Sequence, residues 1–167
     1  MIISRGVSFF LRFAEFAAAA VVLGLIANFL HQHDEGNGGA GPLGREIYTE
    51  VVAALAILLS VALLIPTKTS FLIYPVDLLA SAAWFAAFGA LVDWLDDQSC
   101  GGVWYWSNLT NDSWCGEWKA AEAFSFISAC LWFASFLLGV FVYHKLAKEP
   151  TQTDGTHRRR RWGRSRV

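Results

Sequence analysis

Charged residues are scarce in this chain of 167 residues: aspartate, glutamate, lysine and arginine together make up 16% of it. A soluble domain usually has about a quarter of its residues charged. The few charges are unevenly placed, because the C-terminal tail is strongly basic whereas residues 93–117 are acidic. No nucleic-acid-binding motif accompanies the basic tail, so the asymmetry favours a membrane partner and no nucleic acid is expected.

The apolar segments lack the polar face that a soluble bundle helix shows every 3.6 residues. Four of them, at about 7–30, 47–65, 71–95 and 120–146, reach the roughly 20 residues that span a bilayer. The first three reach that length only when charges near their ends are included. The sequence therefore predicts an all-α fold, an integral membrane bundle of four transmembrane helices.

Lysine and arginine are distributed asymmetrically between the two sides of the membrane that these helices define. One side holds only Arg45 and Lys119, whereas the other holds Arg5, Arg12, Lys68, Lys145, Lys148 and six tail arginines. Because basic loops stay in the cytoplasm, both termini are predicted to be cytoplasmic. The helical domain covers 1–148, and 149–167 form a disordered polybasic tail. A cleaved signal peptide is an alternative for the N-terminus, but Arg12 and Glu15 interrupt its apolar run.

The sequence has only three cysteines, and none of them belongs to a Cys-x-x-Cys pair. Without that pair, and without a visible quinone site, a membrane thiol oxidoreductase is disfavoured. Cys100 and Cys115 bracket the second outer loop, where an oxidising compartment favours a disulfide. Such a bond would stabilise by roughly 3 kcal/mol in the entropy model. Cys130 is expected to pack inertly within the membrane.

The loop between those cysteines carries two glycosylation sequons, which begin at Asn108 and Asn111. Asn108 is favoured for modification because Asn111 lies closer to the fourth helix and the bilayer. The region is also rich in aromatic residues: Trp94, Trp104, Tyr105, Trp106, Trp114 and Trp118. Tryptophan is enriched where hydrocarbon meets headgroups, which predicts an aromatic belt. A ligand-binding aromatic cage is the alternative.

Three of the charged residues in the apolar segments lie near the cytoplasmic ends of the first and third segments. Arg12 and Glu15 are three residues apart and share a helix face, and Asp77 follows Pro75 near the same side of the membrane. Charges in hydrocarbon usually pair or face the bundle interior, so Arg12 is expected to bind Glu15, Asp77 or both. A helix-start acid that complements the dipole is another interpretation of Asp77. A proton or ion relay is a third.

Catalytic motifs are missing from the sequence. It shows no nucleophile with a nearby base, no glycine-rich phosphate loop and no paired catalytic carboxylates, so no catalytic residue, no cofactor and no enzymatic activity are predicted. The run from His31 to Glu35 contains residue types that bind metals. It lacks a framework that would orient them, and no metal site is predicted there.

The end of the chain combines arginine with one tryptophan. The residues are Arg158, Arg159, Arg160, Arg161, Trp162, Arg164 and Arg166. Each basic residue near an anionic leaflet contributes about 1 kcal/mol, which predicts a reversible contact with anionic lipids. A solvated tail that only fixes topology, and an arginine-based sorting signal, are the alternatives.

Short motifs run through the middle of the chain: Tyr48, the run from Leu58 to Pro66, the run from Phe71 to Asp77, the run from Ala82 to Gly89, and Cys100. They resemble the MARVEL family of four-helix membrane proteins, particularly its fungal members. The resemblance covers nearly all four segments and implies a role in membrane apposition, vesicle traffic or lateral organisation of lipid domains. It supplies no catalytic residues, and it does not account for the glycine-rich first loop or the polybasic tail.

The predicted function is a non-enzymatic tetraspan protein that organises membrane domains or acts in membrane trafficking or apposition. Small residues four apart, such as Ala20 and Gly24, allow close approach of helices within the bundle or between copies. The expected partners are membrane lipids, with sterol and anionic lipids as candidates, further copies of the chain, and other membrane proteins. The expected location is the plasma membrane or a secretory-pathway membrane. The alternatives are a small transporter or channel subunit that uses Arg12, Glu15 and Asp77, and a membrane-embedded oxidoreductase or lipid enzyme.

Overall fold

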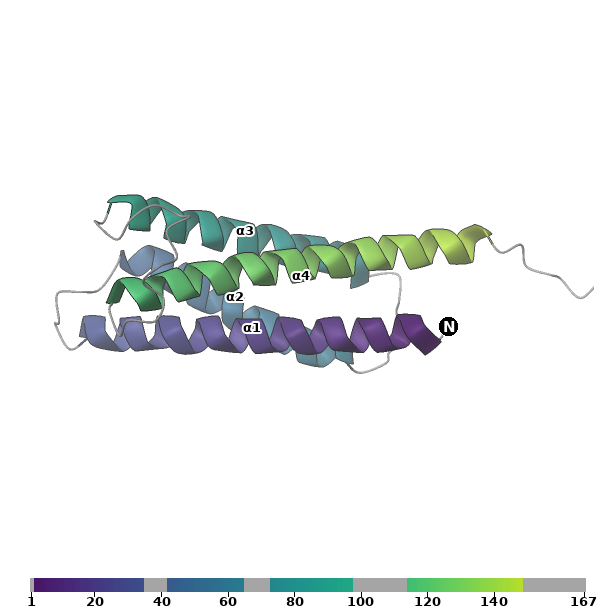
Figure 1. Ribbon diagram of the computed structural model, residues 1–167, viewed down its shortest axis with the longest axis horizontal. Coiled ribbons are helices and arrows are strands. Elements are labelled where there is room, and N and C mark those ends of the chain that lie inside the picture. Colours follow the sequence, from purple (N-terminus) through teal and green to yellow (C-terminus); the bar gives the residue numbers. More distant parts are fainter. Residues whose placement is uncertain (1, 35–41, 65–72, 98–113, 149–167) are drawn as a thin grey trace, which may run out of the picture.

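The computed structural model describes residues 2–34, 42–64, 73–97 and 114–148, and these residues form four α-helices (Figure 1). The helices are α1 (Ile2–Asp34), α2 (Leu43–Leu64), α3 (Ile73–Asp97) and α4 (Trp114–Lys148). The described residues contain no strand. Each helix is long and apolar enough to cross a membrane. The predicted all-α, four-helix transmembrane architecture is therefore confirmed.

A proline lies at the start of each of the two short helices, just before α2 and in the first turn of α3. The backbone N–H groups of Arg45 and Glu46 donate to the carbonyl oxygen of Pro42, at 2.9 and 3.3 Å. Glu46 stands in the first turn of α2, where a negative charge complements the helix dipole. Pro75 stands in the first turn of α3, where its missing N–H leaves no hydrogen bond unmade.

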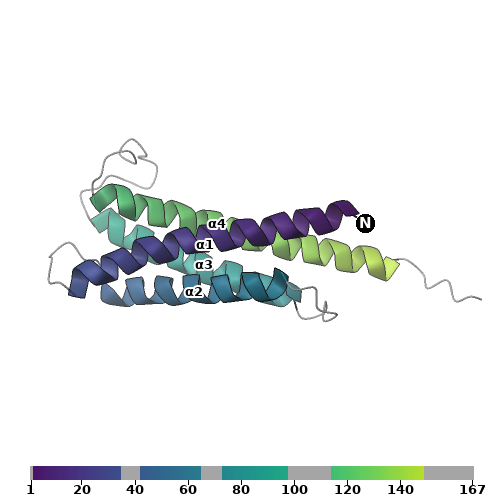
Figure 2. The ribbon, with the colours of Figure 1, turned by 90° about the horizontal axis from the view of Figure 1, so that it is seen from below.

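The helices form an antiparallel bundle in which α1 packs on α2 and α4, and α3 packs on α4 and, less extensively, on α2 (Figure 2). The helices differ in length: α1 has 33 residues and α4 has 35, whereas α2 has 22 and α3 has 25. Both long helices extend past the other two at the end of the bundle that carries the N-terminus (Figure 1). We call this end the terminal end, and the other the opposite end.

Large apolar side chains are found both inside the bundle and on its surface. The largest buried ones are Trp84, Trp118, Trp132, Phe29, Ile26 and Leu91. The rings of Phe29 and Trp118 stack with their centroids 4.6 Å apart. Phe9, Phe10, Leu79 and Phe141 are examples of large apolar side chains that are exposed. An apolar surface of this kind is unfavourable in water but suits contact with lipid chains.

Two aromatic residues of α3 are spaced as the two boundaries of a hydrocarbon core would be. Tyr74 is exposed at its start and lies beside Tyr143 of α4, with ring centroids 6.3 Å apart. Trp94 lies near the end of the same helix. At 1.5 Å per residue, Tyr74 and Trp94 are about 30 Å apart along the axis, which is the thickness of a bilayer hydrocarbon core. Tyrosine and tryptophan are the residues enriched at its two boundaries.

The structure departs from the sequence-based expectations mainly at the start of α4. This helix begins at Trp114, so 114–119, which were expected in the second outer loop, are helical. Trp118 is buried against Phe29 instead of joining an interfacial belt. The following residue, Lys119, is also buried. Cys130, which was expected to pack inside the membrane, is exposed on the bundle surface. The burial of Trp118 follows from the packing of the first turns of α4 on the end of α1.

Candidate functional site

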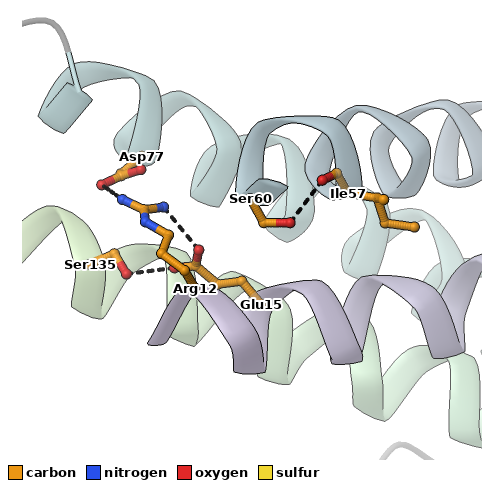
Figure 3. A network of polar contacts seen from close by, with 6 residues as sticks. All are labelled: Arg12, Glu15, Ile57, Ser60, Asp77 and Ser135. Carbon is orange, nitrogen blue, oxygen red and sulfur yellow. Dashed lines mark hydrogen bonds and ion pairs between the residues drawn. The ribbon is translucent and has the colours of Figure 1, made fainter. Parts of the chain in front are cut away.

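Two acidic side chains, one from α1 and one from α3, contact the guanidinium of Arg12 near the terminal end of the bundle (Figure 3). Arg12 Nη1 lies 2.9 Å from Glu15 Oε2 on the same helix, and Arg12 Nη2 lies 2.6 Å from Asp77 Oδ2 on α3. The guanidinium of Arg12 therefore joins α1 to α3 across the interior. Charge-assisted hydrogen bonds of this length are roughly twice as strong as neutral ones.

Helix α4 completes the cluster with a hydroxyl and an aromatic ring. Ser135 Oγ donates to Glu15 Oε1 at 2.5 Å. One turn earlier on α4, the ring of Trp132 lies under the guanidinium of Arg12, with 5.2 Å between the ring centroid and the central carbon. A cation in this position is attracted by the negative face of the ring. We call Arg12, Glu15, Asp77, Trp132 and Ser135 the polar network.

The network is closed to solvent. The exposed fraction of the residue is 0% for Glu15, 1% for Asp77 and 6% for Arg12. Asp77 lies three residues beyond Tyr74, and so on the hydrocarbon side of the boundary that the tyrosines mark. Isolated charges in this environment are costly, and pairing offsets that cost. With both carboxyl groups ionised, the three side chains together would carry one positive and two negative charges.

Helix α2 supplies no charge to the network. Its nearest polar group in Figure 3 is the buried Ser60, whose hydroxyl donates to the carbonyl oxygen of Ile57 in its own helix at 2.9 Å. Residues 51–64 of α2 include no charged side chain. The hydroxyl of Ser60 is therefore satisfied locally. The network itself connects α1 to α3 by an ion pair and α1 to α4 by a hydrogen bond and a cation–π contact.

A second group of polar residues lies toward the opposite end. Glu46 of α2 and Lys119 and Glu122 of α4 are buried there. A more exposed ion pair joins Arg45 Nη2 to Asp93 Oδ2 at 2.6 Å, and Arg45 Nη1 also donates to the carbonyl oxygen of Ala90 at 3.0 Å. Polar contacts thus connect the start of α2 to the end of α3.

Several residues singled out in the sequence lie outside the described part of the structure. They are Cys100, Asn108, Asn111 and the tail residues Arg158, Arg159, Arg160, Arg161, Trp162, Arg164 and Arg166. Cys115 lies in the first turn of α4 and is half-buried. The disulfide, the glycosylation sites and the lipid contact of the tail therefore stay predictions.

Sequence reasoning placed neither Trp132 nor Ser135 in the network, and Ser135 was noted only for its small-residue spacing with Gly139. The available signal was a hydroxyl in the middle of a long apolar run. That signal is ambiguous, because a serine in a helix often bonds to its own backbone. Ser125 of the same helix does so, donating to the carbonyl oxygen of Ala121 at 2.7 Å.

The fold and the network together define a class: a tetraspan integral membrane protein whose interior is closed by paired charges and large aromatic side chains. Comparison with protein families identifies the group more closely. The family model described as MARVEL, a membrane-associating domain, matches residues 5–138, a range that includes nearly all of the first three helices and most of α4. The chain therefore belongs to the MARVEL family. No curated protein matches the chain.

Proposed function

We propose that this protein is a non-enzymatic organiser of membranes, which acts in lateral organisation of the bilayer or in membrane trafficking and apposition. The observation that carries the proposal is the contrast between interior and surface. The interior is filled by large side chains and paired charges, whereas the exposed side chains of the spans are largely apolar. The surface available for recognition is then the one that faces lipids and neighbouring membrane proteins.

The proposal includes a topology and a location. Both termini lie in the cytoplasm, because nearly all lysine and arginine residues fall on that side. The loop between α3 and α4 is then lumenal or extracellular, a setting that suits a Cys100–Cys115 disulfide and a glycan on Asn108. The protein resides in the plasma membrane or a secretory-pathway membrane.

Lipid selection by the outer surface can be tested by exchanging exposed aromatic side chains. Phe9, Phe10 and Phe13 of α1 are all exposed, and leucine at these positions keeps the surface apolar while it removes the rings. We expect the triple Leu variant to fold normally but to copurify with a different set of lipids and to lose any clustered distribution in the membrane. Its matched control is Phe29→Leu, which alters a buried ring of the same helix.

Two results would count against an organising role. One is a wild-type protein whose bound lipids match the bulk bilayer and whose distribution is uniform. The other is a triple variant indistinguishable from wild type in both respects. Mass spectrometry of copurified lipids and single-molecule imaging of the tagged full chain provide the measurements.

A second candidate function is a small transporter or channel subunit. The observation in its favour is the uneven charge of the polar network, which buries two carboxylates with one guanidinium. Buried ionisable groups inside membranes commonly mark ion and proton pathways. Purified protein in liposomes that moves protons or ions, and that loses this activity on Asp77→Asn, would establish transport and displace the organiser proposal.

A further inference from the structure

The charges within the polar network do not balance. Arg12 supplies one positive charge, and Glu15 and Asp77 supply two negative charges when both are ionised. No other described charged group contacts the three residues. On α2, residues 51–64 carry no charged side chain. Residues 123–143 of α4 carry none either, and Cys130 and Tyr143 are the titratable groups among them. An uncompensated charge in hydrocarbon is strongly unfavourable.

One bound proton would restore neutrality, and the geometry selects the oxygen that holds it. Glu15 Oε2 and Asp77 Oδ2 both face guanidinium nitrogens, which are donors and leave no room for a second hydrogen. Asp77 Oδ1 is buried and has no hydrogen-bond partner, so a hydrogen there would find no acceptor. Glu15 Oε1 faces the hydroxyl of Ser135 at 2.5 Å, and a hydroxyl can accept as well as donate.

We propose that the polar network is a proton-binding site, in which a proton from the aqueous phase resides on Glu15 Oε1 and is donated to Ser135 Oγ. Asp77 stays ionised and paired with Arg12. The hydroxyl hydrogen of Ser135 then turns from Glu15 to a carbonyl oxygen one turn back on α4, the arrangement that Ser125 adopts with Ala121. The site is neutral in this state, and it needs no transport activity to exist.

Infrared spectroscopy tests the proposal on the full chain in lipid bilayers, because a protonated carboxylic acid has a carbonyl band distinct from that of a carboxylate. The difference spectrum between wild type and Glu15→Gln at neutral pH should contain a carboxylic-acid band. Glu122→Gln is the control, since Glu122 is another buried carboxyl whose removal should leave the Glu15 band in place. Loss of carboxylate bands alone in the Glu15→Gln difference would overturn the proposal.

Two further variants separate the proton site from a merely buried acid. Ser135→Ala removes the acceptor, so the Glu15 band should remain but shift to higher wavenumber; an unshifted band would contradict the assignment to Oε1. Asp77→Asn leaves one carboxylate with one guanidinium, so Glu15 should release the proton and its acid band should vanish. Persistence of the band in folded Asp77→Asn protein would refute the charge-balance argument. If that variant does not fold, the Glu15→Gln and Ser135→Ala spectra decide the question.

Discussion

Removing the charge of Arg12 should destabilise the bundle more than removing the charge of Arg45, the other helical arginine whose contacts the structure describes. Arg12→Gln keeps a side chain of intermediate length but loses both ion pairs, to Glu15 and to Asp77, and the contact with the ring of Trp132. It also leaves the carboxyl groups of Glu15 and Asp77 buried without a cation. The variant therefore tests whether the polar network holds the helices together.

The expected size of the effect follows from the contacts. Each hydrogen bond to a charged group contributes about 1.5–3 kcal/mol, and the cation–π contact adds roughly 0.5–2 kcal/mol. Part of this is offset, because separated helices in a membrane also find polar partners. Breaking a buried ion pair in proteins costs about 3–5 kcal/mol. We expect Arg12→Gln to lower the free energy of unfolding by about 3–5 kcal/mol.

The chain provides a matched control in Arg45. This arginine pairs with Asp93 at the same distance, 2.6 Å, but the exposed fractions of the two side chains are 36% and 70%, against 8% for Arg12 and 2% for Asp77. Exposed pairs contribute about 0–1 kcal/mol. Arg45→Gln should therefore lower the free energy of unfolding by at most about 1 kcal/mol.

Reversible unfolding in bicelles, measured by steric trapping, provides the assay. Double-mutant cycles isolate the pairwise terms: the coupling of Arg12 with Asp77 should exceed that of Arg45 with Asp93 by more than about 1 kcal/mol. Equal couplings, or an Arg12→Gln variant as stable as Arg45→Gln, would show that burial does not decide the strength of these pairs. The stabilising role of the network would then be wrong.

Three further predictions concern packing, the loop and the tail. Gly139→Val should destabilise the bundle by about 1–3 kcal/mol, because a Cβ on Gly139 would lie 3.2 Å from the Cβ of Tyr74. The control is Gly24→Val, at a site with open space, which should leave thermal unfolding nearly unchanged. Peptide maps of protein from native membranes should show the disulfide Cys100–Cys115 only without reductant, and free thiols at both positions would exclude it. A synthetic tail peptide should bind anionic vesicles at low salt and release as salt rises, and replacing Arg158–Arg161 with alanine should abolish the binding; equal binding to neutral vesicles would rule out the electrostatic contact.

The architecture was predictable because bilayer thickness imposes a direct requirement on sequence. A helix must present about 20 largely apolar residues to cross the hydrocarbon, and the four segments do so at positions that the helices of the structure cover. The boundary of α4 was harder to place. Glu117 and Lys119 interrupt the apolar run, so hydropathy alone begins the helix too late in the sequence. Whether Lys119 is buried depends on packing against other helices, which hydropathy does not encode.

The members of the polar network also differ in how well the sequence alone predicts them. The spacing of Arg12 and Glu15 places both on one helix face whatever the tertiary structure. Asp77 shares their depth in the membrane because α3 starts on the same side. Trp132 and Ser135, by contrast, join the network only through the rotation of α4 about its axis. Apolar periodicity does not reveal that rotation, since α4 has large apolar residues on its buried and exposed faces alike.

Polar residues reveal the rotation where apolar ones do not. In a membrane, lipid accepts an apolar side chain on any outward face, whereas polar side chains favour the interior. The buried polar positions of α4 recur every three residues from Lys119 through Glu122 and Ser125 to Ser128, and again seven residues further on, at Ser135. On α2, Glu46, Thr49 and Ser60 lie on one buried stripe with Ala53 and Ala56. Asn28 of α1, which is exposed, shows that the rule is a tendency. A stripe of polar residues, and not a hydrophobic stripe, is thus the feature by which the interior faces of α2 and α4 can be recognised from sequence.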